Sequence, residues 1–512
     1  MKKNMKLIGL SLLVSTLLLT SCNLFLNSFS PYEFSDQFVS QQYSNENVEL
    51  VSQPSKHFFD VTRSNPNSGL RTLTLKSTGQ QRLLVLPIHF SDYSLDKLDG
   101  NNGIDTHIRL QNAFFGQPEA VMWESVSSFY YRSSYGKLKL EGTVAPWFES
   151  QEYTIAKINS EISGVDKQTI TGNLLREAVE NFKASHSAEE VAFYDSDEDG
   201  YIDATYLVYA YPYSNSRDLG TKNIFWAFAT YDEKSGHQGP GPFAHNYAWS
   251  SSFFMDAHQT LLDRRPDSHT FIHEVTHLFG IPDYYNVELD APSNPVGGFD
   301  MMDYTVGDHT TLTKLLLEWA NPLVLKQEGE VKLRPFAKTG DVLIIPSVWN
   351  GNFLDEFLAL EYYTPTDLNQ FDSRLNDQFK LPNRAGLKVY HIDARTVYEV
   401  RDQSLRTYVY SDEYQEDSAG LFEMLAHTNT TGGINRGKKP EFNLYSLLEK
   451  SGDNTFAQGG KASEQTLFYK GDSFGLETFS DFTFNRGMKI DYSFTIKNQN
   501  SDYITIEFSE KI

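Results

Sequence analysis

The sequence predicts a mixed α+β domain followed by a β-rich, sandwich-like C-terminal domain. Between about residues 79 and 325, apolar runs of strand length alternate with segments of helical periodicity. From residue 326 to 512, short strand-like runs are separated by Gly, Asn, Asp and Pro. A chain of 512 residues is long enough for two or three domains, each with its own core.

Each expected element has its own pattern. The runs RLLVLPIHF (82–90) and ATYLVYAY (204–211) are nearly all apolar, as in strands covered on both faces. In NLLREAVENF (173–182) the apolar residues recur on one helical face, and TLTKLLLEWA (311–320) predicts a further helix. The strands expected in the C-terminal domain are VLIIPSVW (342–349), EFLALEYY (356–363), GLKVYHID (386–393), MKIDYSFTI (488–496) and YITIEFS (503–509).

The first 22 residues have the composition of an export signal. Three lysines precede an apolar stretch from Leu7 to Leu19, shorter than the roughly 18–20 apolar residues of a membrane-spanning helix. The stretch ends in Leu-Thr-Ser-Cys, which looks like a bacterial lipobox in which Cys22 is lipidated. The alternative is an ordinary cleaved signal with an incidental cysteine. We therefore expect a bacterial cell-surface lipoprotein held at the membrane by an N-terminal lipid anchor, or a secreted protein.

The overall composition narrows the classes of function. Forty per cent of the residues are apolar and 14% aromatic, which is typical of a folded globular protein. The formal net charge is −23 and no polybasic run occurs beyond the extreme N-terminus, so we expect no nucleic-acid partner. Cys22 is the only cysteine, which excludes an internal disulfide. Residues 23–78 are rich in Ser, Asn, Gln and Pro and predict a tether or a prosegment that confers latency.

The segment FIHEVTHLFGIPDYYN (271–286) contains the pattern H-E-x-x-H. His273 and His277 are four residues apart, so on a helix they project from the same face and can hold one metal ion. Glu274 lies on the flank of that face, where its carboxylate can act on water without being a ligand. The alternative is a structural helix that carries the pattern by chance. We expect a zinc site with Glu274 as the general base.

The flanks of the pattern strengthen this prediction. Asp267 or Ser268 can cap the start of the helix, and Gly280 followed by Pro282 can end it. A glycine three residues after the second histidine lets the chain turn back towards the metal. Asp283 would then be the third ligand and leave a fourth position for water. The alternative is that Asp283 is an ordinary turn residue.

The segment GGFDMMDYT (297–305) follows this helix. A methionine in a tight turn at this place, Met302, resembles the Met-turn that lies beneath the metal in metzincin proteases. Tyr304 would then help to stabilise the oxyanion. Because methionines and tyrosines are common in cores, both residues also have a plain structural interpretation.

Longer stretches resemble the immune inhibitor A family of secreted bacterial metalloproteases. They are LLVLPIHFSD (83–92), SVSSFYYRSSYGKLKLEGTVAPWF (125–148), FYDSDEDGYIDATYLVYA (193–210) and EFLALEYY with GLKVYHID, and the likeness runs with gaps from about residue 82 to 500. The chain departs from the family pattern at Phe279 and at Glu318, neither of which carries the chemistry. The resemblance implies a zincin/metzincin-like catalytic domain over residues 79–325 and protein or peptide substrates.

The acidic stretch DSDEDGYID (195–203) predicts a calcium loop. Asp195, Asp197, Asp199 and Asp203 match positions 1, 3, 5 and 9 of an EF-hand-like loop, and the carbonyl of Tyr201 matches position 7. Position 12 is tyrosine instead of glutamate, so a full EF-hand is excluded. The expected cofactors are thus a catalytic zinc and a structural calcium ion. The alternative for the loop is a solvated acidic turn.

Together these patterns predict an extracytoplasmic zinc metalloendopeptidase that hydrolyses peptide bonds. The alternative, from a different class, is a surface lipoprotein that acts as a binding or adhesion module with an inactive metal site. An intact Glu274 argues against this alternative, because holding a metal does not require a base there.

Overall fold

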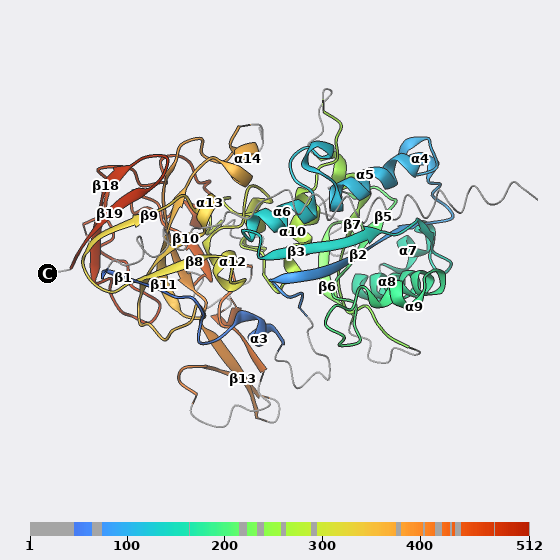
Figure 1. Cartoon of the computed structure of the whole chain (residues 1–512). Coiled ribbons are helices and arrows are strands. Elements are labelled where there is room, and N and C mark those ends of the chain that lie inside the picture. Colours follow the sequence, from blue (N-terminus) through green and yellow to red (C-terminus); the bar gives the residue numbers. More distant parts are fainter. Residues whose placement is uncertain are drawn as a thin grey trace, which may run out of the picture. The chain divides into compact units, whose positions relative to one another are not determined.

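The computed structural model describes residues 46–63, 74–162, 164–214, 223–232, 240–257, 263–287, 294–374, 380–402, 405–414, 422–430, 433–435, 442–475 and 477–510. The expected export signal and Cys22 lie outside these residues. The chain is a mixed α/β structure with several sheets (Figure 1). It divides into two compact units. The first is Thr78–Arg132 with Gly136–Leu278; the second contains Ser133–Tyr135, Phe279–Ile512 and the described part of Phe34–Ser77.

The first unit is built on one sheet with the strand order β3-β2-β5-β7-β6, and the short β4 also pairs with β2. All neighbours are parallel except β6, which is antiparallel to β7 and lies at the edge. The predicted strands at 82–90 and 204–211 are confirmed as β2 and β5. The strands are β2 (Gly79–His89), β3 (Leu138–Val144), β4 (Phe148–Glu149), β5 (Thr205–Tyr209), β6 (Phe228–Tyr231) and β7 (Asn246–Ser251).

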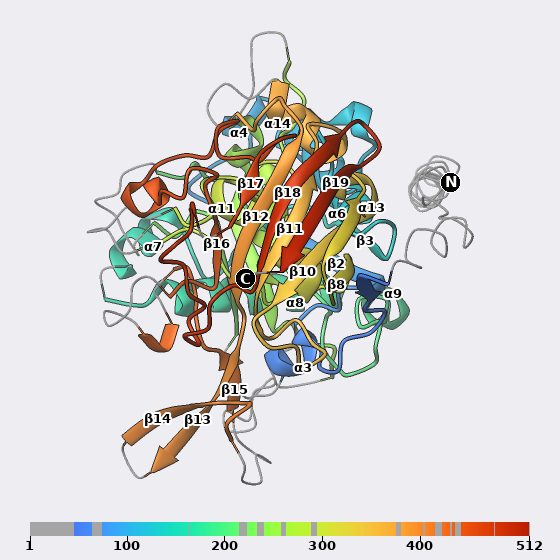
Figure 2. The same cartoon turned by 90° about the vertical axis from the view of Figure 1, so that its left-hand side faces the viewer.

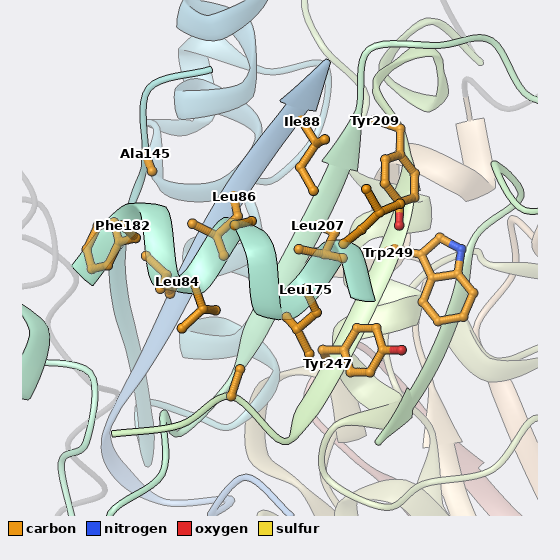
Figure 3. Close-up of a cluster of buried hydrophobic side chains, with 14 of the residues drawn as sticks. Leu84, Leu86, Ile88, Ala145, Leu175, Phe182, Leu207, Tyr209, Tyr247 and Trp249 are labelled. Carbon is orange, nitrogen blue, oxygen red and sulfur yellow. The ribbon is translucent and has the colours of Figure 1, made fainter. Parts of the chain in front are cut away.

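Helix α8 covers one face of this sheet. Figure 3 shows Leu175 and Phe182 of α8 against Leu84 and Leu86 of β2 and Leu207 of β5, all of them buried in one cluster. The helix predicted at 173–182 is confirmed and is longer. The helices of this region are α4 (Asp96–Asp99), α5 (Ile104–Phe115), α6 (Val126–Ser133), α7 (Ile155–Glu161), α8 (Lys167–Ser185), α9 (Ala188–Ala192) and α10 (His269–His277), with 3₁₀ turns at Pro118–Ala120 and Ser252–Asp256.

The second unit contains three sheets. A six-stranded sheet has the order β1-β8-β10-β11-β12-β16, a C-terminal antiparallel sheet has the order β17-β18-β19-β9, and a small sheet has the order β14-β13-β15. Side chains of the first two sheets form one shared core, and Figure 2 shows their strands. The strands are β1 (Val48–Leu50), β8 (Asn321–Leu325), β9 (Gly329–Leu333), β10 (Asp341–Pro346), β11 (Glu356–Tyr363), β12 (Gly386–Asp393), β13 (Thr396–Asp402), β14 (Leu405–Tyr410), β15 (Phe422–Leu425), β16 (Tyr445–Leu447), β17 (Ser473–Phe474), β18 (Tyr492–Gln499) and β19 (Ile504–Glu510).

All five strands predicted for the C-terminal region are present, as β10, β11, β12, β18 and β19. The helix predicted at 311–320 is shorter than expected, because it ends at Leu316 and Glu318 has a left-handed φ of 61°. The N–H of Trp319 turns back to the carbonyl of Lys314, which closes the helix before β8 begins. The helices of the second unit are α3 (Phe58–Arg63), α11 (Met301–Tyr304), α12 (Thr311–Leu316), α13 (Phe336–Thr339) and α14 (Gln370–Arg374), with 3₁₀ turns at Asp367–Asn369, Gly433–Asn435 and Thr455–Gln458.

Part of the expected tether or prosegment is built into the second unit. Strand β1 pairs with β8, and the residue pair Glu49 and Val324 lies in the middle of that register. Lys56 forms an ion pair with Glu423, whose side chain is largely buried. Within the described residues of segment 23–78, β1 therefore contributes to a sheet of the second unit. No helix in the described ranges combines the length and apolar character that crossing a membrane requires.

Candidate metal centre

Helix α10 carries the H-E-x-x-H pattern and is held firmly within the first unit. It contacts strands β6 and β7. Phe271 stacks on Phe114, with ring centroids 4.8 Å apart. The hydroxyl of Tyr130 donates to the carbonyl of Ile272 at 2.7 Å and lies 2.7 Å from the hydroxyl oxygen of Thr276. These contacts fix the position of the helix along its axis and its rotation about that axis. They therefore fix the direction in which its side chains point.

The start of α10 is capped by Asp267, one of the two alternatives from the sequence. The carboxylate of Asp267 accepts from the N–H of His269 at 3.1 Å and lies 2.6 Å from its Nδ1. The ring of His269 stacks on Trp123, with centroids 4.2 Å apart. Ser268 instead donates its hydroxyl to the carbonyl of Ala113. The other alternative, a cap from the Ser268 side chain, is therefore wrong, because that hydroxyl is used elsewhere.

The two predicted histidine ligands project side by side. The ring centroids of His273 and His277 are 5.0 Å apart, and the ring planes are almost perpendicular at 87°. His273 and Glu274 are each only 6% exposed, whereas His277 is half-buried. His273 is therefore the more enclosed of the two candidate ligands, and His277 is the more accessible one.

The chain turns sharply after α10, as the sequence predicts. Gly280 has a φ of 85°, a left-handed conformation that favours glycine. The side-chain amide of Asn246 donates to the carbonyl of Leu278 at 2.9 Å and satisfies one of the free carbonyls at the helix end. Only five residues separate His277 from Asp283, so this turn decides where the aspartate carboxylate can reach.

Asp283 joins the two histidines. One nitrogen of each ring and one carboxylate oxygen of Asp283 lie within 4.8 Å of one another. The residue that follows, Tyr284, is completely buried, and its N–H donates to the carbonyl of Met302 at 2.8 Å. Its own carbonyl accepts from Asn429 at 2.9 Å. The backbone next to Asp283 is therefore anchored, which limits how far its carboxylate can move.

Glu274 is largely buried, and its charge acts on Tyr130, Tyr206 and Lys167. Burial, aided by the negative charge of Glu274, raises the pKa of Tyr206 well above its usual value. Burial lowers the pKa of Lys167, and the charges of Asp166 and Glu274 oppose this shift. The Nζ of Lys167 lies 3.7 Å from the ring centroid of Phe228 on β6. These shifts place Glu274 within electrostatic reach of the cation on α8.

The residues of the predicted Met-turn form the short helix α11, and the position of Met302 beneath a metal stays a prediction. Met302 is completely buried, and its N–H donates to the carboxylate of Asp300 at 2.7 Å. Burial raises the pKa of Asp300 to about 6, although hydrogen bonds from Thr310 and Met302 oppose the shift. Tyr304 ends this helix, and its hydroxyl accepts from the amide of Asn294 at 2.7 Å. The role of Tyr304 as an oxyanion donor stays a prediction.

The acidic loop gathers three of its four aspartates. One carboxylate oxygen from each of Asp195, Asp197 and Asp203 lies within 4.8 Å of the others. Burial, together with the charge of Asp197, raises the pKa of Asp203. Asp199 is not part of this group of three, and its carboxylate accepts from the N–H of Tyr201 at 3.0 Å. The ligand roles of Asp199 and of the Tyr201 carbonyl stay predictions.

Comparison of the sequence with known protein families and with curated proteins gives no match. The functional interpretation therefore depends on the geometry of the site. Sequence reasoning missed Tyr130, which lies 142 residues before its partner Ile272. No local pattern signals such a contact, because the hydroxyl is matched to a carbonyl only in the folded chain.

Proposed function

We propose that this chain is a zinc-dependent endopeptidase. The observation that carries the proposal is the convergence of His273, His277 and Asp283, with Glu274 next to the first histidine on the same helix. Two nitrogens and one carboxylate oxygen form a donor set that zinc accepts at catalytic sites. At bond lengths of about 2.1 Å, two ligands of a tetrahedral ion are about 3.4 Å apart, which fits within the observed limit of 4.8 Å.

The residues can divide the chemistry between them. A zinc ion held by the three ligands would act as a Lewis acid and lower the pKa of water to about 7. Glu274 would accept the proton of the attacking water and pass it to the leaving amine nitrogen. Tyr304 would donate a hydrogen bond to the oxyanion of the substrate carbonyl. Burial of Glu274 helps, because it keeps the carboxylate in one position and reduces competition from bulk water.

The architecture of the first unit is compatible with a peptide substrate. Within the described residues β6 pairs only with β7, so its other edge has no strand partner among them. An extended peptide could add its backbone hydrogen bonds there, next to α10, which contacts β6. A strand edge recognises backbone groups on both sides of a scissile bond, which favours an endopeptidase. The proposed fold is zincin/metzincin-like, and the resemblance to the immune inhibitor A family supports it.

We extend the proposal to the rest of the chain. The shared core of the two larger sheets supports a sandwich-like C-terminal domain. The lipobox-like sequence before Cys22 supports a bacterial cell-surface lipoprotein, or a secreted protein, that acts on protein or peptide substrates. The acidic loop would hold a structural calcium ion, because three neighbouring carboxylates repel one another until a cation neutralises them.

Metal removal tests the proposed function. We expect the purified protein to contain about one zinc per chain and to cleave casein. A zinc-selective chelator should abolish cleavage, and added zinc should restore it. Zinc binding without cleavage, also after residues 23–78 are removed, would favour the binding-module alternative. The absence of bound zinc would contradict the metal site itself.

Calcium binding is tested separately, by thermal unfolding. At a calcium concentration 100 times the Kd, we expect a stabilisation of about 2.7 kcal/mol, and thus a rise of about 5–10 °C in the Tm. Asp195→Asn should remove this rise, because it removes one of the three converging carboxylates. The matched control is Asp453→Asn, at an exposed aspartate in the second unit. An equal rise in wild type and Asp195→Asn would contradict a calcium site in this loop.

A further inference from the structure

A cavity with a volume of about 540 Å³ lies in the second unit. Tyr362 near the end of β11 and Gln499 at the end of β18 line it. The end of β11 is next to the start of β12, because Tyr363 pairs with Gly386. The cavity therefore lies at one end of the two large sheets. Its volume is in the usual range for a small-molecule site, about 300–1,000 Å³.

The charge of this cavity is opposite to that of the chain. Lys338, Arg384 and Lys470 line it, and no aspartate or glutamate is among the lining residues. The chain as a whole has a formal net charge of −23. Three cations around one concavity favour an anionic ligand over a cationic one.

These three cations also differ from most others in the second unit. Arg334, Lys388 and Arg395 each form an ion pair with a buried carboxylate. Within the described residues, no ion pair involves Lys338, Arg384 or Lys470. Their donors therefore remain available to a ligand.

Arg384 is already positioned for binding. Its guanidinium carbon lies 3.7 Å from the ring centroid of Tyr469, so the planar group stacks on the aromatic ring. Stacking occupies the face of the guanidinium and leaves its N–H groups free to donate hydrogen bonds to two oxygens of one acidic group. A stacked arginine loses less conformational entropy on binding than a freely moving one.

The neutral polar groups of the cavity are mostly engaged within the protein. The hydroxyl of Tyr362 donates to the carbonyl of Asn500, and the amide nitrogen of Gln499 donates to the carbonyl of Ala385, both at 2.6 Å. The hydroxyls of Thr364 and Thr366 bond to each other. The groups that remain free to select a ligand are therefore mainly the cations.

We propose that this cavity binds a small anion with two or more carboxylate, sulfate or phosphate groups. Several acidic groups are expected because the three cations come from separate parts of the chain, before β10, before β12 and before β17. The volume accommodates a molecule of up to about disaccharide size. The site is independent of the proposed zinc centre, since none of its lining residues belongs to that centre.

The test is calorimetric titration of the purified protein at 0.15 M salt. Three probes separate the sources of acidic groups: citrate for carboxylates, pyrophosphate for phosphates, and a sulfated uronic-acid disaccharide for acidic glycans. We expect at least one probe to bind with a Kd below about 1 mM, and a neutral disaccharide not to bind. The probe that binds most tightly identifies the class of ligand.

Variants connect the binding to this cavity. Arg384→Gln should weaken the tightest probe by about tenfold, because it removes a bidentate charged donor. Lys470→Gln should weaken it by about threefold, since a lysine offers a point charge and not the bidentate fork of an arginine. Lys489→Gln, at an exposed lysine outside the cavity, is the matched control and should leave the Kd unchanged. Failure of all three probes to bind, or equal binding by wild type and Arg384→Gln, would overturn the proposal.

Discussion

Glu274→Gln should lower the rate of casein hydrolysis by at least about a thousandfold while zinc remains bound at one ion per chain. Glutamine has almost the same shape as glutamate, so the buried position on α10 can accept it without a cavity. It cannot accept a proton from water at neutral pH, so the general base is lost. The measurement is kcat/KM for casein together with the metal content of the same sample.

The control for this experiment is Glu189→Gln, at an exposed glutamate on α9 of the same unit, which should leave both quantities unchanged. A loss of zinc in Glu274→Gln would show that Glu274 holds the metal site together instead of moving a proton. Retention of most of the activity would assign the base to another residue. Each result has a different physical meaning, because zinc content and hydrolysis are measured independently.

Local patterns identified the elements that carry the candidate site. Strand β2 contains the apolar run LLVLPI (83–88), and helix α10 is marked by His273, His277 and the glycine that ends it. Such features depend on periods of two or 3.6 residues and on single-residue conformational preferences, which are visible in a short window. The sequence also placed Asp283 in the turn after the helix, where the structure has it.

Contacts across long stretches of chain could not be predicted in this way. Strand β1 pairs with β8, and Glu49 lies opposite Val324 although 274 residues separate them. The end of α12 is set by the left-handed Glu318, a residue that ordinarily favours helix. Both features depend on contacts between residues that are far apart in the sequence, so neither local propensity nor periodicity reveals them. Tertiary packing overrides local preference at these positions.

Asp283→Asn should reduce zinc affinity by at least about a hundredfold, since the loss of an outer partner alone costs about 10–100-fold. Asparagine keeps the turn-forming property of aspartate, so the path of the chain after Gly280 should remain. What is lost is the negative charge of one of the three converging ligand atoms. Affinity is measured by competition with a zinc chelator, and casein hydrolysis should fall with the fraction of zinc bound.

Asp283→His separates the two interpretations of this residue. If Asp283 is the third ligand, a histidine can offer a nitrogen in its place and should restore part of the zinc affinity that asparagine loses. If Asp283 only forms the turn, asparagine should be neutral, whereas histidine, a weaker turn former, should be the more harmful change. Which of the two variants binds zinc more tightly therefore decides the role of Asp283. The backbone hydrogen bonds of Tyr284 hold the chain beside the substitution in both variants. The two variants should therefore differ only in the side chain at position 283.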